Sequence, residues 1–261
     1  MNTNFPNIAV TAPLVALLLA SQSLAAPGTP TVAGSAGQAS ATSETLSIST
    51  TTAINPGDLV VLAVVSASNQ TPIAADCLLS SSAGCGLSWD GKERNLALAG
   101  TGAPAWMATL NQSFGAMDNS PIRARTWFGY ATSNIPSGST FRVNFGGAIG
   151  AKAATIIVIP GAETSAALSF GGTSGASGAI TFGTTPVLAP SQLVLATSFI
   201  SGGGTDSYTE DVGFTFLHQT SAGAWPAIRV AYKLTSFAGT VGYTLTDSTS
   251  RTWISSYQVA K

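Results

Sequence analysis

The sequence TTAINPGDLVVLAVVSA occupies residues 51–67, and a closely related sequence, TPVLAPSQLVLATSFIS, occupies residues 185–201. The two stretches align without a gap at an offset of 134 residues, which places Pro56 on Pro190. Each contains a turn rich in Pro and small polar residues, followed by a short apolar run of the kind that forms a buried β-strand. The same turn and strand therefore occur twice, which indicates an internal repeat.

A second pair of related stretches extends this repeat. WFGYATSNIPSGSTFRVNF, at residues 127–145, is similar to RVAYKLTSFAGTVGYTL, at residues 229–245, and Tyr130 matches Tyr232. The offset between the copies is 102 residues here instead of 134, so the first copy carries about 32 extra residues between its two conserved stretches. The sequence thus predicts two related β units, one of which contains an insertion.

The spacing of apolar residues determines the expected fold class. Beyond Glu44 they recur with a period of two, and no window forms an amphipathic helix. Short strands between turns rich in Gly and Pro are typical of an antiparallel β-sandwich or jelly roll. We expect an all-β protein with two units that arose by internal duplication.

The predicted segments are an apolar N-terminal arm or signal peptide (1–25), a small-residue linker (26–43), a first β unit (44–165) with an inserted loop (68–121), a Gly/Ser linker (166–178) and a second β unit (179–261).

Charge is sparse along the whole chain. Charged residues make up 8% of the 261 residues and the net charge is −1, whereas about a quarter of residues are charged in a typical soluble domain. The ten Lys and Arg residues are scattered, which argues against a nucleic-acid partner. A surface with so little charge repulsion packs readily against copies of itself, so we expect a homo-oligomer.

The N-terminal stretch NIAVTAPLVALLLASQSLAAPG, residues 7–28, has some features of a secretory signal peptide. It contains an apolar run, Ile8–Ala20, and a small-residue cleavage site that ends at Ala25. Two features argue against a signal peptide: no Lys or Arg precedes the run, and Pro13 lies in its middle. The run is also too short and interrupted for a stable membrane span. Cleavage after Ala25 and an apolar arm that packs within an assembly both remain open.

The inserted loop 68–121 is the leading candidate for recognition, because binding functions concentrate in loops on a rigid scaffold. It contains Trp89 and Trp106, and Trp225 lies in a segment bounded by Gly and Pro in the second half. A tryptophan exposed in such a loop stacks on a sugar ring or fills a pocket of a partner. The alternatives are an insertion that only extends one sheet and tryptophans that cover the edge of the sandwich.

The two cysteines, Cys77 and Cys85, stand in the stretch CLLSSSAGC. This loop can close as a local disulfide if the protein meets an oxidising compartment, and otherwise holds two reduced thiols. Two cysteines and a single histidine, His218, argue against a structural zinc site.

The sequence contains no motif that identifies an enzyme. A Ser-His-Asp hydrolase would need His218, but the chain has no G-x-S-x-G stretch. The only acidic cluster, in GGGTDSYTEDVG, consists of Asp206, Glu210 and Asp211. It is a weak calcium candidate without the usual loop pattern, and a glycosidase would need two carboxylates facing each other in one cleft. We expect no enzymatic activity and no cofactor.

Three stretches, PGDLVVLAVVSA, RTWFGYATSNIPSGSTFRVNF and AATIIVIPGAET, follow one another along the chain. With them, roughly residues 30–260 resemble the β-sandwich proteins of tailed-phage and prophage structural modules, which are tail-fibre, head-fibre or decoration components. The resemblance rests on the strand pattern and departs at IIVIPGAE, where Ile-Pro replaces a common aromatic.

This resemblance implies a virion protein without catalytic residues, whose partners are other virion subunits and whose candidate ligand is a host-surface glycan. The leader-like N-terminus does not suit a virion protein assembled in the cytoplasm. It keeps open an extracellular alternative, a secreted bacterial surface module that binds carbohydrate or mediates adhesion.

Overall fold

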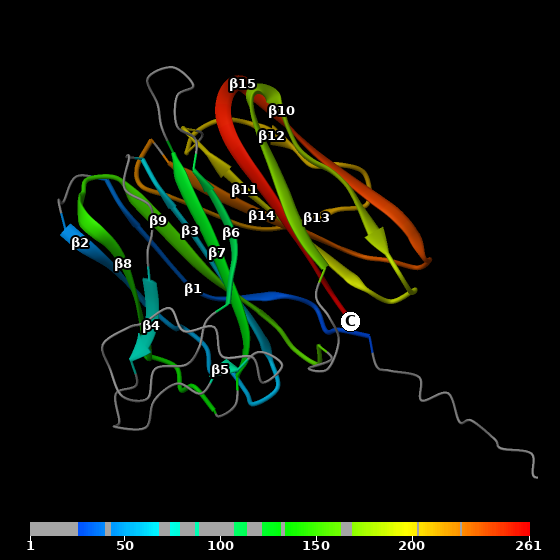
Figure 1. Cartoon of the computed structure of the whole chain (residues 1–261), viewed down its shortest axis with the longest axis horizontal. Coiled ribbons are helices and arrows are strands. Elements are labelled where there is room, and N and C mark those ends of the chain that lie inside the picture. The colour runs from blue at the N-terminus through cyan, green and yellow to red at the C-terminus, as the bar shows by residue number, and fades with distance from the viewer. Residues whose placement is uncertain are drawn as a thin grey trace, which may run out of the picture.

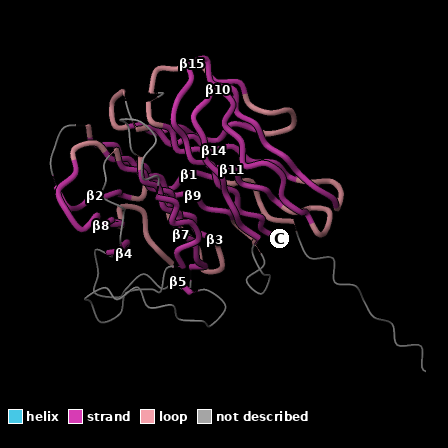
Figure 2. The backbone as a smooth tube through the Cα atoms, turned by 45° about the horizontal axis from the view of Figure 1, so that its top comes forward, coloured by secondary structure: helices cyan, strands magenta, loops and turns pink. Residues whose placement is uncertain are grey.

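The computed structural model contains strands and loops. It describes residues 26–39, 43–67, 74–78, 87–88, 107–113, 122–131, 134–162, 169–202, 204–224 and 226–261. These residues form fifteen strands in antiparallel sheets (Figures 1 and 2). In this part of the chain, no helix has the length and apolar character needed to cross a membrane. The predicted all-β, sandwich-like architecture is confirmed.

The described strands belong to three sheets. The first six-stranded sheet has the order β1 (Thr31–Gln38), β9 (Lys152–Ile159), β3 (Leu59–Ser66), β7 (Arg123–Ala131) and β5 (Leu87–Ser88), with β6 (Met107–Ser113) also paired to β7. The second has the order β10 (Ser169–Val187), β15 (Gly239–Ala260), β11 (Leu193–Ile200), β14 (Ala227–Leu234) and β13 (Thr215–Ser221), with β12 (Tyr208–Thr209) paired to β15. The small sheet has the order β2 (Ser43–Ser49), β8 (Thr140–Ile149) and β4 (Ala74–Leu78).

The two six-stranded sheets pack face to face around a shared apolar layer. We call β1–β9 the first unit and β10–β15 the second unit. The shared layer takes side chains from β3, β7 and β9 of the first unit and from β11, β14 and β15 of the second. The opposite face of the first sheet packs against the small sheet in a separate cluster. Each unit thus has an apolar cluster of its own, and the shared layer joins the two.

The long strands β10 and β15 close the second unit on itself. Their pairing jumps from Ser177 opposite Arg251 to Ala179 opposite Thr246, which leaves residues 247–250 without a counterpart in this ladder. On either side of this break, both halves of β15 contribute to one apolar cluster with β11. We call residues 247–251 the corner segment. On the edge of β15 that faces away from β10, the pairing partner changes here from β12 to β11.

Burial on both faces explains the apolar runs that identified the repeat. All eight residues of β3 and all eight of β11 are buried, and so are all eight of β9. A strand covered on both faces has no reason to alternate apolar with polar residues, so it reads as a continuous apolar run.

Two segments predicted as linkers contain strands instead. β1 lies within residues 26–43, and β10 begins within residues 166–178. Small residues are required in both places because other parts of the chain pass close to the backbone. A Cβ atom on Gly175 would lie 2.7 Å from the ring of Trp253, and one on Gly37 would collide with the backbone of β13. The small residues of these segments therefore belong to strands and do not mark linkers.

The two larger sheets have equivalent strand orders, because β1, β9, β3, β7 and β6 occupy the same places as β10, β15, β11, β14 and β13. The predicted match of Tyr130 with Tyr232 is two residues out of register. Tyr130 lies opposite Leu59, whereas the residue opposite Leu193 is Leu234. A shift of two residues keeps each side chain on the same face of its strand, so the sequence pattern does not reveal it. Duplication as the origin of this equivalence stays a prediction.

The described parts of the predicted insertion 68–121 extend the sheets. β4 pairs with β8, and β5 and β6 both pair with β7. These three strands join two different sheets rather than one, and a recognition role for the rest of the insertion stays a prediction.

Candidate functional site

The predicted site residues fall into two groups. Four lie outside the described residues: Trp89, Trp106, Trp225 and Cys85. Cys77 belongs to β4, which pairs with β8. The disulfide and the tryptophan-based binding site therefore stay predictions. The described candidates are the three acids around β12, and we built the site from these.

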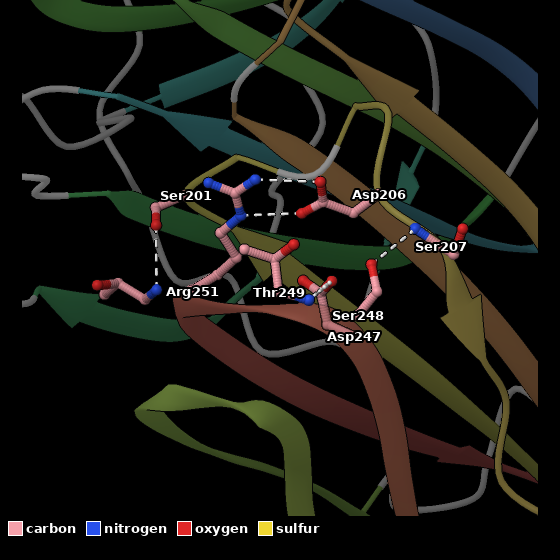
Figure 3. A network of polar contacts seen from close by, with 8 residues as sticks. Ser201, Asp206, Ser207, Asp247, Ser248, Thr249 and Arg251 are labelled. Carbon is pink, nitrogen blue, oxygen red and sulfur yellow. Dashed lines mark hydrogen bonds and ion pairs between the residues drawn. The ribbon is translucent and has the colours of Figure 1, made fainter.

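Asp206 binds the corner segment of β15. Arg251 donates two parallel hydrogen bonds to its carboxylate, from Nε to Oδ2 at 2.8 Å and from a terminal nitrogen to Oδ1 at 3.0 Å (Figure 3). Paired bonds of this geometry are stronger than a single contact between the same charges. They raise the pKa of Arg251, mainly through the hydrogen bonds to Asp206.

A second carboxylate, Asp247, lies in the same corner segment and is only 5% exposed. Its Oδ1 accepts a hydrogen bond of 2.9 Å from the Thr249 amide, while Oδ2 has no hydrogen-bond partner among the described residues. Burial raises the pKa of Asp247, and so does the neighbouring carboxylate of Asp206. We call Asp206, Asp247 and Arg251 the corner cluster.

Backbone contacts hold the segment before β12 against the corner of β15 (Figure 3). The Ser248 amide donates to the Ser207 carbonyl at 3.0 Å, and the Ser207 amide donates to Ser248 Oγ at 3.2 Å. At the other end, the Thr252 amide donates to Ser201 Oγ at 3.1 Å. The corner cluster therefore sits between two points where the loop and the strand are bound together.

Glu210 binds the face of β14 instead. Its Oε1 accepts a hydrogen bond of 2.6 Å from Arg229 Nε, and its Oε2 accepts one of 2.8 Å from the Tyr243 hydroxyl. The Arg229 guanidinium also lies between two rings, 4.7 Å from the centroid of Tyr208 and 4.1 Å from that of Phe216. Arg229 on β14 thus links the side chains of β12 to those of the neighbouring strand β13.

The environment of the two tyrosines disfavours their ionisation. Burial raises the pKa of Tyr243, and the carboxylate of Glu210 raises it further. Burial also raises the pKa of Tyr208, with additional contributions from Asp247 and Asp206. Both side chains therefore act as neutral phenols at physiological pH.

Asp211 has backbone partners. Its Oδ2 accepts a hydrogen bond of 3.0 Å from the Thr244 amide, and its Oδ1 accepts one of 2.7 Å from the Val212 amide. The three acids of the predicted calcium loop therefore point to different partners, and the structure does not bring them together. Among the described residues, no group of three or more His, Cys, Asp or Glu side chains is arranged to hold a metal ion.

The single histidine, His218, lies in β13 opposite Val230 and is half-buried. Its Nε2 has no hydrogen-bond partner among the described residues. Burial lowers the pKa of His218, so the neutral ring is favoured.

The sequence analysis missed a buried cation in the first unit. Lys152 is completely buried and donates three hydrogen bonds of 2.8 Å each, to the carbonyls of Ser43 and Ile149 and to Ser43 Oγ. Burial lowers its pKa. The signal was present in KAATIIVI, where a lysine begins an otherwise apolar strand.

No protein-family model matches the chain, and a search of curated proteins finds no match. The site must therefore be interpreted from its own geometry. Asp206, Glu210, Arg229 and Arg251 all hold one segment of the second unit against another. These ion pairs position loops on the sheet.

Proposed function

We propose that the protein is a non-enzymatic structural component of a phage virion, a subunit of a capsid or tail appendage or a decoration protein. The observation that carries the proposal is that two ion pairs in the second unit each fix a loop. Arg251 pairs with Asp206 and Arg229 with Glu210, and each pair holds a loop in place. A protein whose task is contact needs surface segments held rigidly in this way, because ordering them at the moment of binding would reduce affinity.

The scaffold supports the same proposal. β3 and β11 are buried on both faces, so their sheets form a rigid interior that leaves the connecting segments outside. The residues between β3 and β7 are the predicted insertion, which contains Trp89 and Trp106 as well as the strands β4, β5 and β6. Binding residues are typically carried by loops on such a scaffold.

Exposed apolar side chains favour assembly with other subunits. The large exposed ones among the described residues all lie in the second unit: Leu188, Val212, Phe216, Leu234 and Phe237. Leu188 is 75% exposed, and the turns that carry Leu188 and Phe237 are joined by hydrogen bonds between Gln192 and Thr235. Exposed apolar side chains of this size are common at protein interfaces.

The test is the location and N-terminus of the native protein. We expect mass spectrometry of purified particles to find this chain with its N-terminal peptide intact. A chain that begins at Ala26 in the extracellular fraction, and that no particle contains, would contradict the virion proposal.

The alternative is a secreted bacterial module that binds carbohydrate, which the leader-like residues 7–28 favour. Its test is binding of the protein starting at Ala26 to immobilised surface glycans, with variants of Trp106 and Trp225 changed to Ala. Glycan binding that these variants abolish, together with cleavage after Ala25, would support this alternative.

A further inference from the structure

The unpartnered oxygen of Asp247 requires an explanation. The residue is only 5% exposed, and one carboxylate oxygen has no hydrogen-bond partner among the described residues. A buried acceptor without a partner costs free energy, and an ionised one costs more. Such a group is retained where its surroundings supply a partner under some condition.

Two acids of the corner cluster, Asp206 and Asp247, share a single positive charge, that of Arg251. Arg251 is committed to Asp206 through both oxygens of that carboxylate. Among the described residues, the other ionisable neighbour is Tyr208 on β12, which is neutral, and Gly178 of β10 packs against the backbone carbonyl of Asp247 without offering a charge. With both acids ionised, the corner cluster holds two negative charges and one positive charge.

One added proton removes this imbalance. A proton on Oδ2 would let Asp247 donate a hydrogen bond to the neighbouring carboxylate of Asp206, which keeps its two bonds to Arg251. The unpartnered oxygen then has a partner, and the cluster becomes neutral. The direction of the pKa shift of Asp247, which comes from burial and from Asp206, agrees with this geometry.

We infer that the corner cluster is an acid-strengthened clasp, which binds the segment before β12 more tightly to β15 when Asp247 takes up a proton. The sign follows from linkage. Because the folded protein holds this proton more tightly than the unfolded chain, the contribution to stability is present at low pH and is lost as the pH rises through the folded pKa. This inference does not depend on the proposed function.

Hydrogen exchange at the amides that join the loop to the strand tests the clasp. We expect the protection factors of Ser248 and Thr252, corrected for intrinsic exchange rates, to be about threefold to tenfold higher at about pH 4, close to the usual pKa of an aspartic acid, than at about pH 7.5. In Asp247→Asn the amide donates permanently to Asp206, so protection should be high at both pH values. Asp211→Asn is the matched control, because Asp211 lies on the same loop but binds only backbone amides, and it should respond to pH like the wild type.

A wild-type protein whose protection falls in acid, or an Asp247→Asn variant with the wild-type response to pH, would overturn the inference. If that variant fails to fold, the carboxyl carbon of Asp247 can be titrated by NMR in the wild-type protein. We expect its midpoint to lie above the usual value of about 3.9, and a midpoint at or below this value would equally overturn the clasp.

Discussion

At the scale of single residues, the two copies of the turn before the buried strand have the same backbone conformation but not the same residue. Gly57 in the first copy has a φ of 88°, and Ser191 in the second has a φ of 63°. Both amides donate a 2.7 Å hydrogen bond to the end of the neighbouring strand, Gly57 to Ala131 and Ser191 to Thr235. The second copy therefore keeps a left-handed turn without the residue that favours it.

This comparison predicts that Ser191→Gly stabilises the protein. A side chain in the left-handed region costs about 1–2 kcal/mol, and the greater freedom of unfolded glycine offsets part of the gain, so we expect about 0.5–1 kcal/mol in the free energy of unfolding. Chemical denaturation measures the change. The reciprocal variant, Gly57→Ser, should lower stability, and a Ser191→Gly variant less stable than the wild type would contradict the prediction.

His218 predicts a pH dependence opposite in sign to that of Asp247. Because burial lowers the pKa of His218 from its usual 6.5, the unfolded chain binds this proton more readily than the folded protein does. The stability that the neutral ring provides is present above about pH 6.5 and is lost as the pH falls through the folded pKa. We expect His218→Gln to remove this loss. The measurement is the free energy of unfolding of the variant minus that of the wild type, determined at about pH 8 and at about pH 5. A difference that does not change with pH would refute it.

At the scale of elements, close packing explains the small residues of β10. Gly175 faces the ring of Trp253, its partner in the ladder, and the indole nitrogen donates a hydrogen bond of 3.3 Å to Ser177 Oγ. The strand needs glycine here because the ring occupies the space of a side chain.

We therefore expect Gly175→Val to lower the free energy of unfolding by about 1–3 kcal/mol, as overpacked sites do. Ala176→Val is the matched control, because Ala176 is the next residue of the same strand and is exposed. It should change stability by less than about 0.5 kcal/mol. Equal effects of the two variants in chemical denaturation would show that the contact with Trp253 is unimportant.

The apolar and alternating runs predicted most of the strands, because burial on one or two faces leaves a direct pattern in the sequence. β1 and the start of β10 were missed for a physical reason. Their residues are small because segments distant in the sequence pack closely against them, as Trp253 does against Gly175. The composition of such a strand is the same as that of a flexible linker. The acids of the candidate site were identified, but their partners Arg251 and Arg229 come from distant strands. Asp247 and Lys152 could not be predicted as buried charges, because a single charged residue forms no sequence motif.

At the scale of the whole molecule, the shared apolar layer should make the two units unfold together. Leu195 of β11 is completely buried in this layer, which also contains Val61 and Phe128 of the first unit. Separating the units would expose to water the two faces that form this layer, so each unit needs the other to keep its own face buried.

We expect a single unfolding transition that probes in both units report at the same denaturant concentration. Leu195→Ala should lower the free energy of unfolding by about 2–5 kcal/mol without splitting the transition. Leu188→Ala, at an exposed position, is the control and should cost less than about 0.5 kcal/mol. Two separate transitions in the wild-type protein would disprove the coupling.

The position of β15 in its sheet determines when the sheet can be completed during synthesis. β15 lies between β10 and β11, and both of those strands precede it in the sequence. During synthesis, the edges of β11 and of the uncharged β10 that pair with β15 therefore stay open until residues 239–260 have left the ribosome. Open strand edges of this kind attract other chains. Slow translation or a shortage of chaperones at that stage should thus favour aggregation of nascent chains, even though the finished protein is well packed.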